Sequence, residues 1–156
     1  MGLYENMNDE PVRRLNLRDP VLVKETESVK SVVAKMRDRD LGCALLVNDN
    51  NEPIGMFTEC MLTQLIVHDL AGLDDPVDKH AAKRWPQVSL DDNIAAVLDS
   101  LDIKNTRFLA VVDENGQVAG LAGQKGLMEY IAEHFPRQVM VQRVGQKPNM
   151  QSREGA

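Results

Sequence analysis

The apolar positions of the chain recur along the sequence with a constant offset. The segment ALLVNDNNEPIG at residues 44–55 returns as LAVVDENGQVAG at residues 109–120, so that the two copies lie 65 positions apart. The same offset aligns the flanking residues without a gap from Pro11 to Ile66. Few aligned residues are identical, but the apolar positions coincide, as they would in two copies of one fold. A unit of about 65 residues is small to be stable alone, so we expect two half-domains that share a core.

The first copy has the pattern of a strand, a helix, two strands and a closing helix. Residues 21–23 form a short apolar run, and Ser28 is a good N-cap for a helix with apolar residues at i, i+3, i+4 and i+7. The continuous apolar run 43–47 predicts a buried strand, and residues 52–57 predict its partner after an Asn-rich turn. Residues 58–70 predict the closing helix. Its expected inward side chains are Leu62, Leu65 and Ile66.

The second copy repeats this order after a linker at residues 71–76. Asn93 takes the place of Ser28 as an N-cap, and Asn115-Gly116 predicts a tight hairpin turn. The expected elements are a short strand at Val88, a helix with Ile94, Val97, Leu98 and Leu101 on one face, strands at 108–112 and 118–122, and a helix at 125–134 with Leu127, Tyr130 and Ile131 inward.

These patterns divide the chain into a first repeat at residues 11–70, a second at 76–135 and a C-terminal extension at 136–156. Residues 1–10 look like a loose lead. Residues 138–144 could form one more strand, and the composition of residues 145–156 is that of a mobile tail.

Composition and charge exclude several classes of function. The net charge of −6 and the pI near 5.0 argue against sequence-independent binding to nucleic acid. No apolar run is long enough to span a membrane, and the polar N-terminal segment does not have the pattern of a secretory signal. Two cysteines do not make a disulfide framework. We therefore expect a cytoplasmic protein without membrane or nucleic-acid partners.

The strand, turn and strand of each copy resemble those of a CBS domain. The resemblance is strongest in FLAVVDENGQVAGL, residues 108–121, is shared by ALLVNDNNEPIGMFTE, residues 44–59, and extends over residues 11–134. The chain is thus similar to a pair of CBS domains, a Bateman module. The resemblance implies a mixed α/β (α+β) fold of two β-α-β-β-α repeats packed with pseudo-two-fold symmetry, which leaves two clefts.

In that family the clefts commonly hold adenosyl ligands such as AMP, ADP, ATP, S-adenosylmethionine or NAD derivatives, and occupancy regulates an enzyme, channel or transporter. Modules usually pair again into a disc-like dimer. The resemblance therefore implies a homodimer and a regulated partner that is a separate protein, because no catalytic or transport domain is recognisable in this sequence.

The family's binding motif places a Thr or Ser three residues after the Gly of the last strand, and an Asp three residues further on. The hydroxyl lies at a helix N-terminus, which favours phosphate, and the carboxylate accepts hydrogen bonds from the ribose hydroxyls. The first copy keeps Thr58 but has Met61 in place of the Asp, and the second has Gly123 and Gly126 at the two positions. The loss of one charge-assisted hydrogen bond, about 1.5 to 3 kcal/mol, weakens a site about tenfold to hundredfold.

Several residues could line the clefts, and each also has a purely structural explanation. Thr58 could contact phosphate or only cap its helix, and Lys125 and Arg107 could be solvated surface charges. Trp85, before Pro86, could stack on a base or fill a core or dimer contact. The predicted ligand-binding residues are Thr58, Met61, Cys43, Arg107, Phe108, Gly123 and Lys125.

The sequence contains no recognisable catalytic or metal-binding motif. The three histidines lack metal-ligand spacing, and no motif surrounds a nucleophile. An enzymatic hypothesis would require turnover that is lost in Cys60→Ser or His80→Ala. The favoured hypothesis is a non-enzymatic regulatory module that senses an adenosyl-type ligand and signals to a partner protein. The alternative is a ligand-free scaffold for dimerisation or protein interaction.

Overall fold

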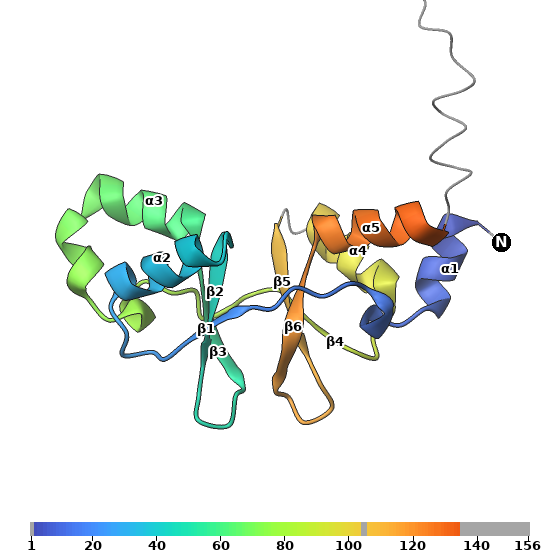
Figure 1. Cartoon of the computed structure of the whole chain (residues 1–156), viewed down its shortest axis with the longest axis horizontal. Helices are drawn as coiled ribbons and strands as arrows, with labels where there is room; N and C mark the ends of the chain where they lie inside the picture. Colours follow the sequence, from blue (N-terminus) through green and yellow to red (C-terminus); the bar gives the residue numbers. More distant parts are fainter. Residues whose placement is uncertain (1, 104–105, 135–156) are drawn as a thin grey trace, which may run out of the picture.

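The computed structural model describes residues 2–103 and 106–134. The strand expected at 138–144 and the tail expected at 145–156 lie outside the described residues. Within the described part, the chain folds into two similar halves of mixed α and β structure that lie side by side (Figure 1).

The first half contains the five elements that the sequence predicts. They are β1 (Val21–Val23), α2 (Val29–Asp38), β2 (Cys43–Val47), β3 (Pro53–Thr58) and α3 (Glu59–His68). The sheet order is β1-β2-β3, with β1 parallel to β2 and β2 antiparallel to β3. Every residue of β2 is buried, as its unbroken apolar run predicts for a central strand.

The second half repeats the first at the same offset. Its elements are β4 (Gln87–Ser89), α4 (Ile94–Ile103), β5 (Phe108–Val112), β6 (Val118–Gly123) and α5 (Gln124–His134), and its sheet order is β4-β5-β6. The sheets share an irregularity of register, between Leu46 and Val47 in one and between Val111 and Val112 in the other. The two-copy prediction is therefore confirmed at the level of single residues.

The predicted N-caps of the two equivalent helices are also confirmed. The Ser28 hydroxyl accepts a hydrogen bond from the Ser31 amide at 3.2 Å, and the Asn93 side-chain oxygen accepts one from the Ala96 amide at 2.9 Å. Both bonds satisfy a first-turn amide that has no partner within its helix.

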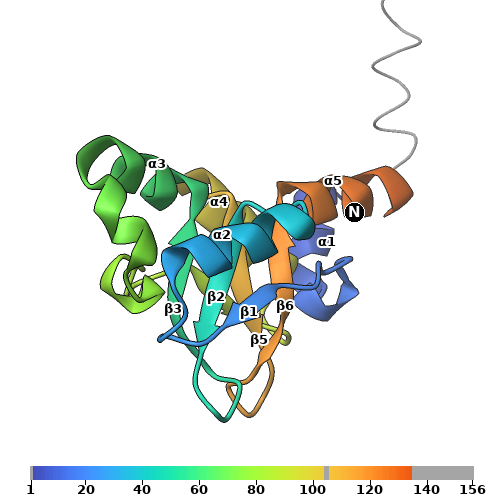
Figure 2. The same cartoon turned by 60° about the vertical axis from the view of Figure 1, so that its left-hand side comes forward.

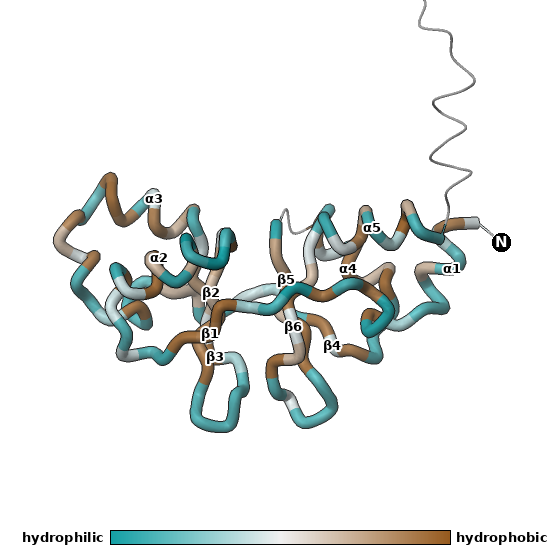
Figure 3. The backbone as a smooth tube through the Cα atoms, viewed as in Figure 1, coloured by the Kyte–Doolittle hydropathy of each residue, from teal (hydrophilic) through white to brown (hydrophobic). Residues whose placement is uncertain are grey.

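The two sheets meet at the centre of the molecule, and the helices lie outside them (Figures 1 and 2). Ala110 and Leu121 of the second sheet are fully buried in the core cluster of the first half, around Phe57. The strands are hydrophobic where they meet, whereas the hairpin turns are hydrophilic (Figure 3). The halves therefore share apolar surface, as the size of one repeat led us to expect.

The opening segment of each repeat packs on the opposite half. Val12 is buried in the core of the second half, and its amide donates to the Asp92 carbonyl at 2.8 Å. Val77, its equivalent, is buried in the core of the first half and donates to the Glu27 carbonyl at 2.7 Å. The chain therefore crosses between the halves. Each core includes a residue from the opening segment of the other repeat.

The expectation of a loose lead at residues 1–10 is wrong. Leu3–Asp9 forms helix α1, and Met7 is 1% exposed in the core of the second half. The Tyr130 hydroxyl donates to the Glu10 carboxylate at 2.8 Å, and this bond holds the pKa of Glu10 below its ordinary value. Burial raises the pKa of Tyr130 to about 12. The N-terminal segment is thus fastened to α5.

The end of the first repeat also differs from the prediction. Helix α3 ends at His68, and the expected linker begins with a 3₁₀ helix, Leu70–Asp74. Ile66, expected to point inward, is 49% exposed, whereas Leu65 is buried and Leu62 partly buried. The inward face of α3 is formed by Met61, Leu62 and Leu65, and Ile66 lies beside this face on the solvent side.

No helix in the described ranges has both the length and the apolar character required to cross a membrane.

Candidate functional site

Two cavities lie where the last strand of each half enters the following helix. The large cavity, about 710 Å³, is bounded by the start of α3 and by segment 82–86. The small cavity, about 380 Å³, is bounded by the start of α5 and by segment 16–18. Residues 58–61 of the large cavity are equivalent to residues 123–126 of the small cavity, so the two form a pseudo-symmetric pair.

The two cavities are neighbours, because three residues line both. Arg107 and Phe108, at the start of β5, and Gln124, at the start of α5, contribute to each cavity. Of the seven residues predicted to bind a ligand, Thr58 and Met61 line the large cavity, Gly123 and Lys125 the small one, and Arg107 and Phe108 both.

Cys43 is not among the residues that line either cavity. Its side chain is 1% exposed within the first core, and burial raises the pKa of its thiol to about 12. A thiol of this kind stays neutral at physiological pH and contributes packing rather than nucleophilic chemistry. The other cysteine, Cys60, is exposed at the start of α3 and lines the large cavity.

Thr58 caps α3 and also lines the large cavity. Its hydroxyl accepts a long hydrogen bond of 3.5 Å from the Met61 amide, so it caps α3. The same residue lines the large cavity at the helix N-terminus, where backbone amides and the helix dipole favour an anion. A long capping bond leaves the hydroxyl able to take part in a contact with phosphate.

The large cavity has an apolar wall with few charges. Met56, Met61, Trp85 and Phe108 supply aromatic and thioether surface. Trp85 also packs on the first core, and its indole N–H donates to Gln87 at 3.2 Å, which orients the ring. The charged lining residues are Glu59, Arg84 and Arg107. Aromatic and methionine side chains of this kind suit a flat apolar group such as a base.

The glycines of the small cavity are required by close backbone approaches. A Cβ at Gly123 would lie 2.9 Å from the Arg107 carbonyl oxygen across the β5–β6 pair. A Cβ at Gly126 would lie 2.9 Å from the Asn16 carbonyl oxygen. The position at which the family motif has its carboxylate is therefore covered by the backbone of segment 16–18, because the opening segment lies against α5.

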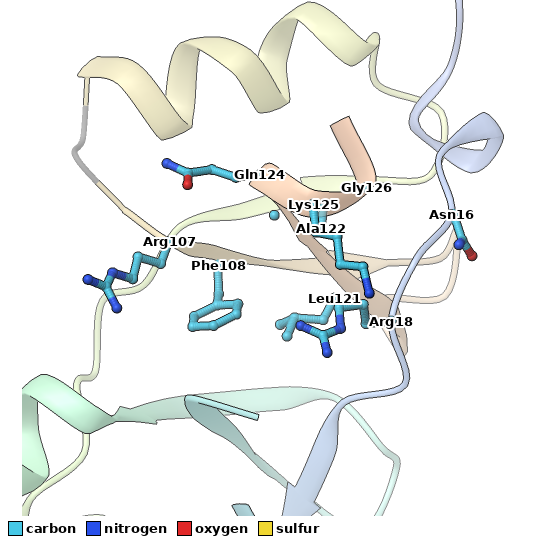
Figure 4. Close-up of a pocket in the computed structure, with 10 residues that line it drawn as sticks. Asn16, Arg18, Arg107, Phe108, Leu121, Ala122, Gln124, Lys125 and Gly126 are labelled. Atoms are coloured by element: carbon cyan, nitrogen blue, oxygen red, sulfur yellow. The ribbon is translucent and has the colours of Figure 1, made fainter. Parts of the chain in front are cut away.

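The small cavity carries three cationic side chains and, among the described residues that line it, no acidic one. Arg18 and Lys125 lie at one end of the view in Figure 4, and Arg107 lies at the other, beyond Phe108. Lys125 is 3.9 Å from Glu129, whereas Arg18 and Arg107 have no ion pair within residues 2–103 and 106–134. This arrangement favours an anion.

Sequence reasoning missed Arg18 and Arg84 as cavity residues. Both belong to the opening segments of their repeats and reach the cavities only because these segments cross between the halves. No spacing in the sequence signals this contact. In the described part of the chain, no group of three or more His, Cys, Asp or Glu side chains could hold a metal ion.

Comparisons with known proteins agree with this architecture. The family model of the CBS domain matches residues 12–68 and 81–133, which together exceed half of the chain. A curated relative, an uncharacterized protein of Methanopyrus kandleri, is 27% identical over 115 residues, which are 72% of this chain and 58% of that protein. The chain spans between 33% and 63% of the length of the curated relatives that it matches.

Two solved structures share the fold. A CBS domain protein from Pyrobaculum aerophilum complexed with AMP is 21% identical, has a TM-score of 0.70, and covers 88% of this chain and 100% of its own. A CBS domain pair in complex with 5′-methylthioadenosine and S-adenosyl-L-methionine is 11% identical, has a TM-score of 0.70, and covers 80% and 97%. With two family matches on two equivalent halves, the chain belongs to the CBS domain family, as a tandem pair of CBS domains.

Proposed function

We propose that this CBS domain pair is a non-enzymatic regulatory module that binds an adenosyl-type ligand in the large cavity. The observation that carries the proposal is the composition of that cavity. An aromatic and thioether wall, with Trp85 and Met61, lies beside a helix N-terminus capped by Thr58. A volume of about 710 Å³ is within the range of small-molecule sites in proteins.

The parts of the cavity suit the parts of such a ligand. The base would lie against Trp85 and the methionines, and a phosphate or carboxylate would lie near Thr58 and Arg84. AMP, ADP, ATP and S-adenosylmethionine are the proposed ligands. The two solved CBS proteins that bind AMP or S-adenosylmethionine and methylthioadenosine support this class.

Regulation follows if the ligand binds one arrangement of the halves better than another. The large cavity is lined by residues of both halves, since Arg107, Phe108 and Gln124 face α3 and segment 82–86 across it. A ligand there would bias the relative angle of the halves, and a separate partner protein would detect the shift. The size of the response is limited by the differential affinity of the ligand for the two arrangements.

A thermal-shift panel with AMP, ADP, ATP, S-adenosylmethionine and NADH tests ligand binding. A ligand at about 100 times its Kd stabilises the fold by about 2.7 kcal/mol, which raises the Tm by about 5 to 11 °C. We expect one adenosyl compound to give such a rise, and Thr58→Ala to reduce it.

Ser28→Ala is the matched control for Thr58→Ala. Ser28 caps α2 in the same way but is not among the residues that line either cavity. Both variants should lose about 0.5 to 2 kcal/mol of stability through the cap. Only Thr58→Ala should reduce the ligand-dependent rise. An equal ligand response in the two variants would remove Thr58 from the site, and no response in the wild type across the panel would contradict the proposal.

An exposed apolar patch supports a second role, in which the pair associates with another copy or a partner. Ile66 and Val67 in the last turn of α3, and Leu70 just after it, are between 49% and 70% exposed. Exposed apolar side chains that form a contiguous patch are typical of interaction sites. We propose that this patch contributes to a homodimer, which is also the surface that a scaffold function would use.

Sedimentation measurements test this patch. We expect the wild type to sediment as a dimer and Val67→Glu to shift it to the monomer, because a charge would be buried without a partner. Tyr4→Glu, at an exposed apolar position on α1 at the other end of the molecule, should leave the dimer intact. A wild type that remains monomeric at high concentration would contradict a homodimer.

A further inference from the structure

The small cavity differs from the large one in both size and charge. It has about 380 Å³ against about 710 Å³. Its described lining includes Arg18, Arg107 and Lys125 and no acidic residue, whereas Glu59 lines the large cavity. We propose that the small cavity is a separate site for a compact phosphate anion of the pyrophosphate class, without a requirement for a nucleoside.

The packing of segment 16–18 disfavours a nucleoside in this cavity. The Arg18 amide donates to the Leu121 carbonyl and the Leu121 amide to the Arg18 carbonyl, both at 2.9 Å, as Ala82 and Met56 pair in the large cavity at 2.8 and 3.1 Å. The difference between the cavities lies at Asn16. The Asn16 carbonyl oxygen blocks the space into which a side chain at Gly126 would project. A Cβ at Gly120 would lie 2.9 Å from the Leu17 Cβ. The cavity thus lacks the carboxylate that would hold a ribose, and the Asn16 backbone occupies the place where that side chain would project.

Arg18 and Lys125 lie close to each other in the small cavity and would bind the anion, whereas Arg107 lies beyond Phe108 (Figure 4). Arg18 is fixed through its backbone, Lys125 is the second residue of an eleven-residue helix, and Arg107 immediately precedes β5. One guanidinium group can donate two parallel hydrogen bonds to phosphate oxygens. The helix dipole at the N-terminus of α5 also favours a bound anion. The chain as a whole has a net charge of −6, whereas the described lining of this cavity has three cationic residues and no acidic one.

Phosphate groups could reach the small cavity from two sources. One is a free inorganic anion. The other is the phosphate chain of a nucleotide whose base occupies the large cavity, since Arg107 lines both cavities. Both sources present phosphate oxygens to Arg18 and Lys125. Titrations with inorganic pyrophosphate and with nucleotides distinguish the two sources.

Calorimetric titration of the full chain with inorganic pyrophosphate, AMP and ATP tests the proposal. We expect pyrophosphate to bind and Arg18→Gln and Lys125→Gln each to weaken it about tenfold or more. Lys30→Gln removes the same charge from an exposed position on α2, outside the residues that line either cavity, and should have little effect. The backbone hydrogen bonds of Arg18 remain in Arg18→Gln, so the fold should persist.

The outcomes are distinct. Pyrophosphate binding that depends on Arg18 supports a site for a free anion, and it does so even if AMP fails to bind and the proposed adenosyl function is wrong. ATP binding that depends on Arg18, with AMP binding that does not, supports the same cation site occupied by the phosphate chain of a nucleotide. If neither pyrophosphate nor ATP responds to Arg18→Gln or Lys125→Gln, the proposal is overturned.

Discussion

Met61→Asp is expected to increase the affinity of the large cavity for AMP about tenfold to hundredfold. Met61 lines this cavity in the first turn of α3, at the position where the CBS motif has its aspartate. An ionised carboxylate there can accept hydrogen bonds from both ribose hydroxyls, and a charge-assisted bond contributes about 1.5 to 3 kcal/mol. An acidic residue in the first turn also suits the helix dipole. Calorimetric titration with AMP measures the change.

Gly126→Asp is the matched control, because it makes the equivalent change in the small cavity. It should give no gain in AMP affinity and should destabilise the fold, since its Cβ would lie 2.9 Å from the Asn16 carbonyl oxygen. Met61→Asn, which keeps the shape without the charge, should give a smaller gain than Met61→Asp. A folded Met61→Asp variant with the AMP affinity of the wild type would show that no ribose lies beside α3.

Met7→Ala is expected to lower the free energy of unfolding by about 2 to 5 kcal/mol. This is the usual cost of removing a buried methionine side chain and leaving a cavity. Met7 is 1% exposed and packs with Val12, Leu15 and residues of α4 in the second core. Urea denaturation of the wild type and the variant measures the difference.

Tyr4→Ala controls for general effects on α1. Tyr4 is on the same short helix but is 57% exposed, so its replacement should change stability by less than about 0.5 kcal/mol. If Met7→Ala were as harmless as Tyr4→Ala, the N-terminal segment would be the loose lead that the sequence suggested, and the second core would be complete without it.

The two-copy fold could be predicted because its signals are local. Each strand is an apolar run bounded by a turn, and Ser28 and Asn93 mark equivalent helix starts 65 residues apart. The cavities could be located in outline for the same reason, since Thr58 and Gly123 end the last strands of the two copies. Periodicity and capping are properties of neighbouring residues, so they can be recognised without knowledge of the tertiary arrangement.

The parts that could not be predicted depend on contacts between distant segments. Arg18 lines a cavity of the second half because its segment crosses over, and Gly126 contacts Asn16 for the same reason. Helix α1 is seven residues long, too short for a periodic pattern, and one buried methionine fixes it. Ile66 has the right spacing for an inward position, but the inward face of α3 is formed by Met61, Leu62 and Leu65, and Ile66 lies beside it.

These contacts also change the meaning of the missing aspartates. In the sequence, Met61 and Gly126 look like two instances of the same loss. In the structure they differ, because Met61 borders an open cavity and Gly126 is covered by the backbone of Asn16. A carboxylate can therefore be restored in one cavity and not in the other, which is why we assign the adenosyl ligand to the large cavity.

The fluorescence of Trp85 offers the most direct test of a ligand in the large cavity. Trp85 is the one tryptophan of the chain, and it lines that cavity. Wild type and Met61→Asp would be titrated with AMP, ADP, ATP, S-adenosylmethionine and 5′-methylthioadenosine. We predict a saturable change in Trp85 emission with at least one compound, at lower concentration in Met61→Asp. Unchanged emission in both proteins up to millimolar concentrations of every compound would contradict an adenosyl-binding role.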